Sequence, residues 1–171
     1  LFRRSLPAVI AILVAVACGI AQAQPKTLVG HTDPPYAGVY TPDGKRLITA
    51  AFDKTLRVWD LASLTSIRTM QGHTGLVLCL SLSKDGSRLA SGSLDNTVRL
   101  WDLPVNTPVA TLAAHAGQTS AAVSIDGQWW VTGGAGNSIK IWNAADRQLV
   151  REIGGLPHPI IRVALRADKQ Q

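Results

Sequence analysis

Three segments of this chain repeat one another at a spacing of about 42 residues. Three markers carry the period: Trp59, Trp101 and Trp142; His31, His73, His115 and His158; and Asp-Gly pairs that begin at Asp43, Asp85 and Asp126. A period in the low forties indicates a repeat architecture, in which a single unit cannot bury its own faces. Stacked units suit binding more than an enclosed active site, so we expect an interaction surface.

Each repeat predicts four short strands. In the middle repeat they fall at 76–83, 88–92, 97–101 and 108–112, separated by turn-forming residues such as Asp85 and Gly86. Residues 97–101 alternate polar and apolar side chains, the period-2 pattern of a half-buried strand. No segment after residue 24 shows a sustained helical period. The prediction is one antiparallel sheet per repeat.

The repeat resembles the tryptophan–aspartate (WD) repeat family of β-propellers. The pairs that carry the resemblance are Gly30-His31 with Trp59-Asp60, Gly72-His73 with Trp101-Asp102, and the altered Ala114-His115 with Trp142-Asn143. The resemblance covers residues 25–168. It implies an all-β partial propeller of about three four-stranded antiparallel blades, at 31–70, 73–112 and 115–153. Flanking fragments would be the outer strand of a preceding blade at 26–29 and a partial fourth blade at 158–171.

In that family a His, a Ser or Thr, an Asp and the Trp form a buried hydrogen-bonded tetrad. Matched position by position, the resemblance implies His31, Thr49, Asp53 and Trp59 in the first blade, and His73, Ser91, Asp95 and Trp101 in the second. The third would have His115, Thr132 and Trp142, with Gly136 in place of the Asp. We therefore expect the third blade to be the loosest.

The same residue types could suggest chemistry, but their repetition argues against it. His73, Ser91 and Asp95 have the composition of a nucleophilic triad. An equivalent trio recurs 42 residues earlier, and a constellation present in every sheet is structural. One histidine per blade is also too dispersed for one metal coordination sphere. We predict no catalytic residues, no metal site and no cofactor.

The first 23 residues predict a bacterial signal peptide, which we expect to form a helix. Arg3 and Arg4 precede an apolar run from 6 to 21, and Ala21-Gln22-Ala23 places small residues at a cleavage-like position. The expected location is therefore periplasmic or extracellular, with cleavage near Gln24. Two alternatives stay open: retention of the segment as a membrane anchor, or lipidation at Cys18.

The formal charge of the chain is +6, and its basic residues are scattered. Nucleic-acid binding needs a clustered basic patch, so we expect no nucleic-acid partner. Cys79 lies in an apolar stretch and is interpreted as a small buried hydrophobe.

Three apolar residues are candidate contacts for a protein or peptide partner. Phe52 and Leu94 precede the tetrad Asp in their turns, at the rim where similar propellers contact partners. By register Trp130 should face inward, and two alternatives stay open for Trp129: an exposed partner contact or packing at the sheet edge. The predicted function is a non-catalytic interaction or scaffolding module. The alternatives are a fragment of an exported propeller enzyme and a sensing module of a larger protein.

Three blades and a fraction do not complete a ring, because propellers hold four to eight blades. Three explanations stay open: the chain is a piece of a longer propeller, it self-associates to complete the ring, or it forms a short open stack.

Overall fold

The computed structural model describes residues 9–11, 26–103, 108–124 and 127–164. All regular structure in these ranges is β-strand, as the sequence predicts for the repeats. The described ranges accordingly contain no helix that could cross a membrane.

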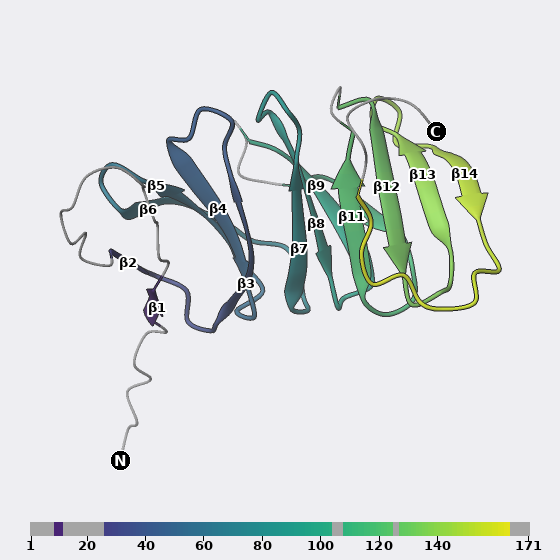
Figure 1. Cartoon of the computed structure of the whole chain (residues 1–171), viewed down its shortest axis with the longest axis horizontal. Coiled ribbons are helices and arrows are strands. Elements are labelled where there is room, and N and C mark those ends of the chain that lie inside the picture. Colours follow the sequence, from purple (N-terminus) through teal and green to yellow (C-terminus); the bar gives the residue numbers. More distant parts are fainter. Residues whose placement is uncertain (1–8, 12–25, 104–107, 125–126, 165–171) are drawn as a thin grey trace, which may run out of the picture.

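Twelve of the strands form three four-stranded antiparallel sheets, in which the spatial order of the strands follows the chain. We call them blade one, blade two and blade three (Figure 1). Blade one contains β3 (Pro35–Tyr40), β4 (Arg46–Ala51), β5 (Leu56–Asp60) and β6 (Thr65–Met70). Blade two contains β7 (Val77–Leu82), β8 (Arg88–Ser93), β9 (Thr97–Asp102) and β10 (Pro108–Ala113). Blade three contains β11 (Thr119–Val123), β12 (Trp129–Gly134), β13 (Ile139–Asn143) and β14 (Leu149–Ile153).

In blades one and two, the Asp-Gly pair closes the first hairpin. Between β3 and β4, Asp43 Oδ1 accepts hydrogen bonds from the Thr41 hydroxyl at 2.6 Å and from the Lys45 amide at 3.0 Å. Gly44 follows with a φ of 66°, a left-handed conformation that glycine adopts without a steric penalty. The side chain therefore fixes the turn that aligns the two strands.

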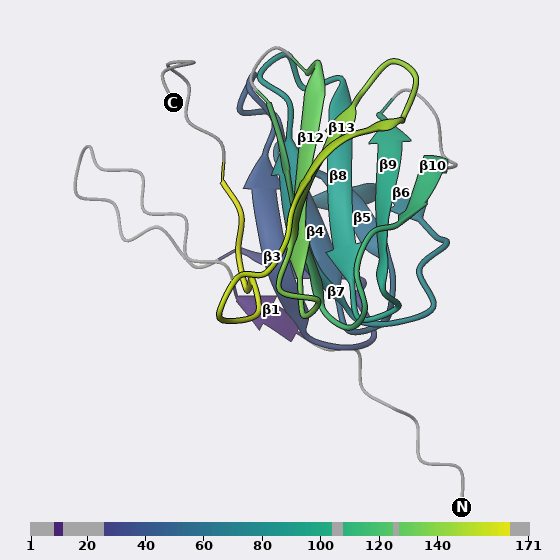
Figure 2. The same cartoon turned by 90° about the vertical axis from the view of Figure 1, so that its right-hand side faces the viewer.

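The blades stack side by side, with their first strands β3, β7 and β11 adjacent along one side (Figures 1 and 2). Each blade has an incoming face toward the preceding blade and an outgoing face toward the following one. Alternation along a strand separates the two faces: in β5, Leu56 and Val58 lie on the outgoing face, while Trp59 lies on the incoming face. The apolar cores lie between blades one and two and between blades two and three.

The strand that precedes each blade contributes one apolar side chain to the core of that blade. Met70 at the end of β6 packs with Leu89 and Trp101 of blade two. Leu112 of β10 packs in the same way with Trp130 of blade three. At the start of the stack, Leu28 in β2 (Thr27–Val29) packs with Leu47 and Trp59 of blade one. We call these side chains the plug residues.

The N-terminal helix prediction is wrong where the structure describes that segment. Val9–Ala11 forms strand β1, which pairs antiparallel with β2. An extended segment can hydrogen-bond to another strand, and this one has a partner nearby in space. The rest of the predicted signal peptide lies outside the described residues.

The predicted partial fourth blade shows no strand over its described residues, 158–164, and 165–171 lie outside the described part. The segment nevertheless contacts blade three: the Ile160 amide donates to the Gly134 carbonyl at 3.0 Å, and the Val163 amide donates to Ser120 Oγ at 3.2 Å. With so few backbone hydrogen bonds, it lies against the sheet without joining a ladder.

Candidate functional site

In blade one, the tetrad is a single chain of hydrogen bonds. The Trp59 indole donates to Thr49 Oγ1 at 2.7 Å, and Thr49 Oγ1 lies 2.8 Å from His31 Nε2. On the far side of the ring, His31 Nδ1 donates to Asp53 Oδ2 at 2.7 Å. The buried polar side-chain atoms of this tetrad are thereby all paired, which removes the cost of burying them.

Blade two contains the same chain of contacts. Trp101 donates to Ser91 Oγ at 2.9 Å, Ser91 Oγ lies 2.8 Å from His73 Nε2, and His73 Nδ1 donates to Asp95 Oδ2 at 2.8 Å. The second carboxylate oxygen accepts from the hydroxyl of Thr97 at 2.6 Å. The carboxylate therefore fastens both the histidine and the turn that precedes β9.

Burial and hydrogen bonding set the charge states of the tetrad. Burial lowers the pKa of His73, which favours the neutral ring that this hydrogen-bond chain requires. Burial alone would raise the pKa of Asp95, but hydrogen bonds from Thr97 and His73 outweigh it and lower the pKa to about 2. The pKa values of His31 and Asp53 are lowered in the same way. At neutral pH each pair is a neutral imidazole donating to a carboxylate.

Blade three retains the inner half of the tetrad. Trp142 donates to Thr132 Oγ1 at 3.0 Å, and His115 Nε2 lies 3.0 Å from the same oxygen. Gly136 stands where the carboxylate would be, and His115 Nδ1 lies 3.4 Å from Ser138 Oγ. That distance leaves the third histidine held more weakly than the other two.

The tetrad residues are placed for structure rather than for chemistry. The three histidines, Thr49, Ser91 and Thr132 are all buried, so no substrate reaches a hydroxyl or an imidazole there. Within the described residues, no group of three or more His, Cys, Asp or Glu side chains is arranged to hold a metal ion.

The partner-contact candidates differ in exposure and position. Leu94 is 44% exposed in the turn after β8, and Phe52 is half-buried in the equivalent turn after β4. Trp129 is 38% exposed, but it begins β12 and so lies at the opposite end of the strands, while Trp130 is buried. The structure thus brings Phe52 and Leu94 to one rim and separates Trp129 from them.

Sequence reasoning missed Tyr36, which completes this rim. Its ring stacks on Phe52 with centroids 5.7 Å apart and an interplanar angle of 22°, and Tyr36 is 61% exposed. It lies where the pairing of β3 with β4 shifts register, which no repeat motif marks.

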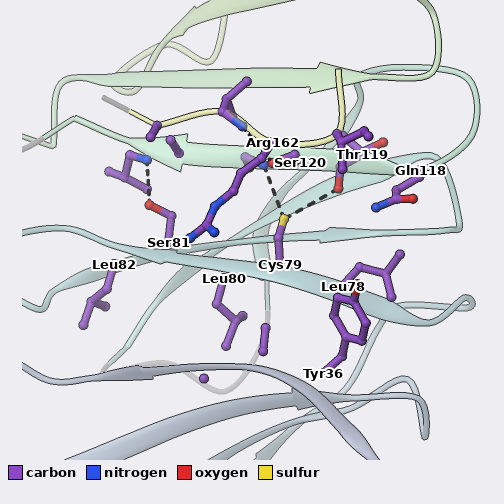
Figure 3. A pocket seen from close by; sticks show the side chains of 18 residues that line it. Tyr36, Leu78, Cys79, Leu80, Ser81, Leu82, Gln118, Thr119, Ser120 and Arg162 are labelled. Atoms are coloured by element: carbon purple, nitrogen blue, oxygen red, sulfur yellow. Dashed lines mark hydrogen bonds between the residues drawn. The ribbon is translucent and has the colours of Figure 1, made fainter. Parts of the chain in front are cut away.

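A groove of about 770 Å³ runs along the first strands and residues 161–164 (Figure 3). On its wall, the Ala121 amide donates to Cys79 Sγ at 3.3 Å, and the Val123 amide donates to Ser81 Oγ at 2.9 Å. Burial raises the pKa of the Cys79 thiol. Cys79 is therefore more than the apolar filler that the sequence suggested: with Ser81 it ties β7 to β11 across the gap between two blades. We call these two contacts the inner-strand bridge.

Comparisons with known proteins agree with the repeat pattern. The family described as "WD40: WD domain, G-beta repeat" matches residues 22–60, 64–102 and 106–143. Two solved chains, described as "Structure of U3-55K" and "Crystal structure of RRP9 WD40 repeats", each superimpose with a TM-score of 0.75 at 24% identity. Each match covers 80% of this chain, and covers 44% and 43% of the solved chains respectively.

A curated relative is "Regulator of rDNA transcription protein 13" of Saccharomyces cerevisiae, 46% identical over 37 residues. That match covers 22% of this chain and 20% of the relative. The chain thus spans less than half the length of each of these proteins. The family match is broader, because its three segments together cover more than half of the chain. The chain therefore belongs to the WD domain, G-beta repeat family.

Proposed function

We propose that this chain is a non-catalytic interaction module that binds a protein or peptide segment at the rim formed by Tyr36, Phe52 and Leu94. The observation that carries the proposal is the stacked Tyr36–Phe52 pair, because it leaves an aromatic surface exposed at the same rim as Leu94, which is 44% exposed. The His, Ser and Thr side chains of the tetrads are unsuited to act as reagents, because they are buried and hydrogen-bonded to one another.

The stacked pair suits recognition on physical grounds. Aromatic anchors supply a large contact area for few rotatable bonds, and they dominate the energetics of many interfaces. Phe52 is also fixed by its backbone, whose amide donates to the Pro34 carbonyl at 3.0 Å. Leu94 is fixed in the same way by the Leu76 carbonyl, also at 3.0 Å. The rim is thus built on anchored turns, which reduces the entropic cost of binding.

The test is selection of binding peptides from a random display library on the full chain, followed by titration against variants. Tyr36→Ala and Leu94→Asp should each weaken a selected peptide by about ten-fold or more. Trp129→Ala is the matched control, because it removes an exposed aromatic at the opposite end of the strands. Binding lost in Trp129→Ala and kept in Tyr36→Ala would place the site at the other rim and overturn the proposal.

We propose further that the chain is exported and processed near Gln24. Support comes from the charged start, the apolar run and the small residues at 21–23. Expression in a bacterium, followed by fractionation and intact-mass measurement, should give a periplasmic product that begins at Gln24. A Cys18→Ser variant distinguishes lipidation, because only a lipidated product would change its fraction. A cytoplasmic product with its first residues intact would contradict export.

A further inference from the structure

A fourth residue, Ile153, stands at the position of the plug residues but has no following blade to pack into in the described structure. Strand register defines this position: Met70 pairs with Leu56, Leu112 with Val98, and Ile153 with Ile139. Leu28, Met70 and Leu112 each pack into the blade that follows them. Ile153 ends blade three in the equivalent position, and it is 39% exposed where Met70 is 0% and Leu112 9% exposed.

The outer part of the outgoing face of blade three, next to Ile153, is also more exposed than its equivalents in the other blades. Ile139 and Ile141 are half-buried, whereas the equivalent residues in the first two blades are buried: Leu56, Val58, Val98 and Leu100. The inner half of this face is covered, because Ile160 and Val163 lie on Gly133. The outer half therefore presents three aliphatic side chains of the kind that pack against a following blade elsewhere in the chain.

Blade one carries the matching surface. Its incoming face has Leu47, Trp59 and Leu61 at the positions that Leu89, Trp101 and Leu103 occupy in blade two. The outer part of this face is filled by Leu28, but the inner part is open. Tyr40 is 48% exposed there, beside a cavity of about 260 Å³ that Leu47 and Tyr36 also line.

We propose that blade one of a second copy of this chain docks by its incoming face on the outgoing face of blade three, head to tail. The proposal rests on the interaction role proposed above and adds a partner and a surface to it. One chain carries both halves of an interface that it already forms twice internally, between blades one and two and between blades two and three. Such a heterologous contact repeats from copy to copy, and it either closes a ring or extends.

If the two copies dock as neighbouring blades do within the chain, β2 of one copy and residues 160–163 of the other must move off the faces that they cover. Ile153 of one copy takes the socket that Leu28 fills in the other, so β2 must be displaced. Strand β3 of the incoming copy likewise replaces residues 160–163. Both segments are held by few backbone hydrogen bonds: among the described strands β2 pairs with the three residues of β1 alone, and 160–163 form no ladder. Cleavage near Gln24 would remove β1 and would weaken the hold on β2 further.

The test uses light scattering and sedimentation of the full chain over a range of concentrations. The wild type should show a mass that rises above the monomer with concentration. Ile153→Asp and Tyr40→Asp each place a carboxylate on one half of the interface at an exposed position, so each variant alone should lose association. An equimolar mixture of the two should form a 1:1 dimer and nothing larger, because only one intact pairing remains.

Leu28→Ala should have the opposite effect and lower the concentration needed for association about ten-fold, since the competing plug is lost. Ile67→Asp is the matched control, because Ile67 is 50% exposed on β6 of blade one, away from both end faces. Circular dichroism confirms that each variant keeps its sheet content.

Three outcomes would overturn the proposal: a wild type that stays monomeric, an equal loss of association in Ile67→Asp, or a mixture that fails to dimerise. A monomeric wild type whose Ile153→Asp variant is also less stable would show instead that the chain's own residues cover this face. Peptide titration of the Ile153→Asp variant keeps the two proposals distinguishable, because this variant cannot associate but keeps Tyr36, Phe52 and Leu94 and should still bind the selected peptide.

Discussion

Trp142 donates its indole N–H to Thr132 Oγ1 at 3.0 Å, so the inner half of the tetrad persists in a blade that has lost its carboxylate. The loss is local. Gly136 follows Thr132 by four residues, as Asp53 follows Thr49 and Asp95 follows Ser91. A side chain at Gly136 would meet no atom within 4 Å of its Cβ.

We therefore predict that Gly136→Asp stabilises the chain. The new carboxylate should accept a hydrogen bond from His115 Nδ1 and raise the free energy of unfolding by about 1 kcal/mol. Urea denaturation measures the gain, and amide hydrogen exchange should show slower exchange in β12 and β13. Gly136→Ala is the control, because it removes the backbone freedom of glycine without adding an acceptor. Equal stabilisation by both variants would show that the carboxylate contributes nothing.

The glycine before the tetrad histidine has a packing role. A Cβ at Gly30 would lie 2.9 Å from Arg57 Nη1 and 2.9 Å from the buried ring of Trp59. Gly30→Ala should therefore lower the free energy of unfolding by about 1–3 kcal/mol. Adding Arg57→Lys should restore part of that loss, because the third repeat has Ala114 and Lys140 at these two positions. Gly154→Ala, where a Cβ meets nothing within 4 Å, is the control. A double-mutant cycle with no coupling would contradict this interpretation.

The tetrads make the fold sensitive to acid. The pKa of His73 is lower in the folded state than the unfolded value of 6.5, so the unfolded chain takes up a proton first as the pH falls. The stability that depends on neutral His73 is therefore complete above pH 6.5 and is lost as the pH falls below it. Asp95, with its pKa lowered to about 2, adds stability above the unfolded value of 3.8 that is lost as the pH falls toward 2. Stability measured in urea should therefore fall in two stages, below pH 6.5 and below pH 4. In Asp95→Asn the lower stage should shrink, and an unchanged profile would assign that stage to other groups.

The inner-strand bridge predicts a specific cost. Ser81→Ala leaves the Val123 amide without its acceptor, which should lower the free energy of unfolding by about 1 kcal/mol. Hydrogen exchange should become faster at the Val123 amide. It should stay unchanged in blade one, where Val39 stands at the position of Ser81 and its side chain offers no acceptor. Thr69→Ala on the exposed side of β6 is the control. The same change in exchange in Ser81→Ala and Thr69→Ala would mean that the inner-strand bridge contributes no specific stability.

The sequence predicts what lies within one repeat, because the relevant residues have fixed spacings along a single sheet. The all-β class, the antiparallel hairpins and the absence of helix from the repeats follow from Asp-Gly turns and period-2 strands. Contacts between repeats are harder to predict. The bridge from Cys79 and Ser81 joins strands about 42 residues apart, and Ala37 and Val39 occupy the equivalent positions in blade one without it.

Two further features had no signal in the sequence. Tyr36 stacks on Phe52 because a register shift turns it outward, and such a shift depends on how the strands pair. The signal-peptide pattern at the N-terminus predicted a helix, whereas the described Val9–Ala11 pairs with β2, a contact that this local pattern does not encode.

Each plug residue belongs to one sheet and completes the core of the next, so the chain offers no clean cut between sheets. A protease that nicks the linker after Met70 would leave that methionine held inside the neighbouring sheet, and the two pieces should stay together until both unfold. Shortening this protein by one sheet therefore requires removal of a unit that runs from one outer strand to the next, in phase with the family repeat rather than with the visible sheets.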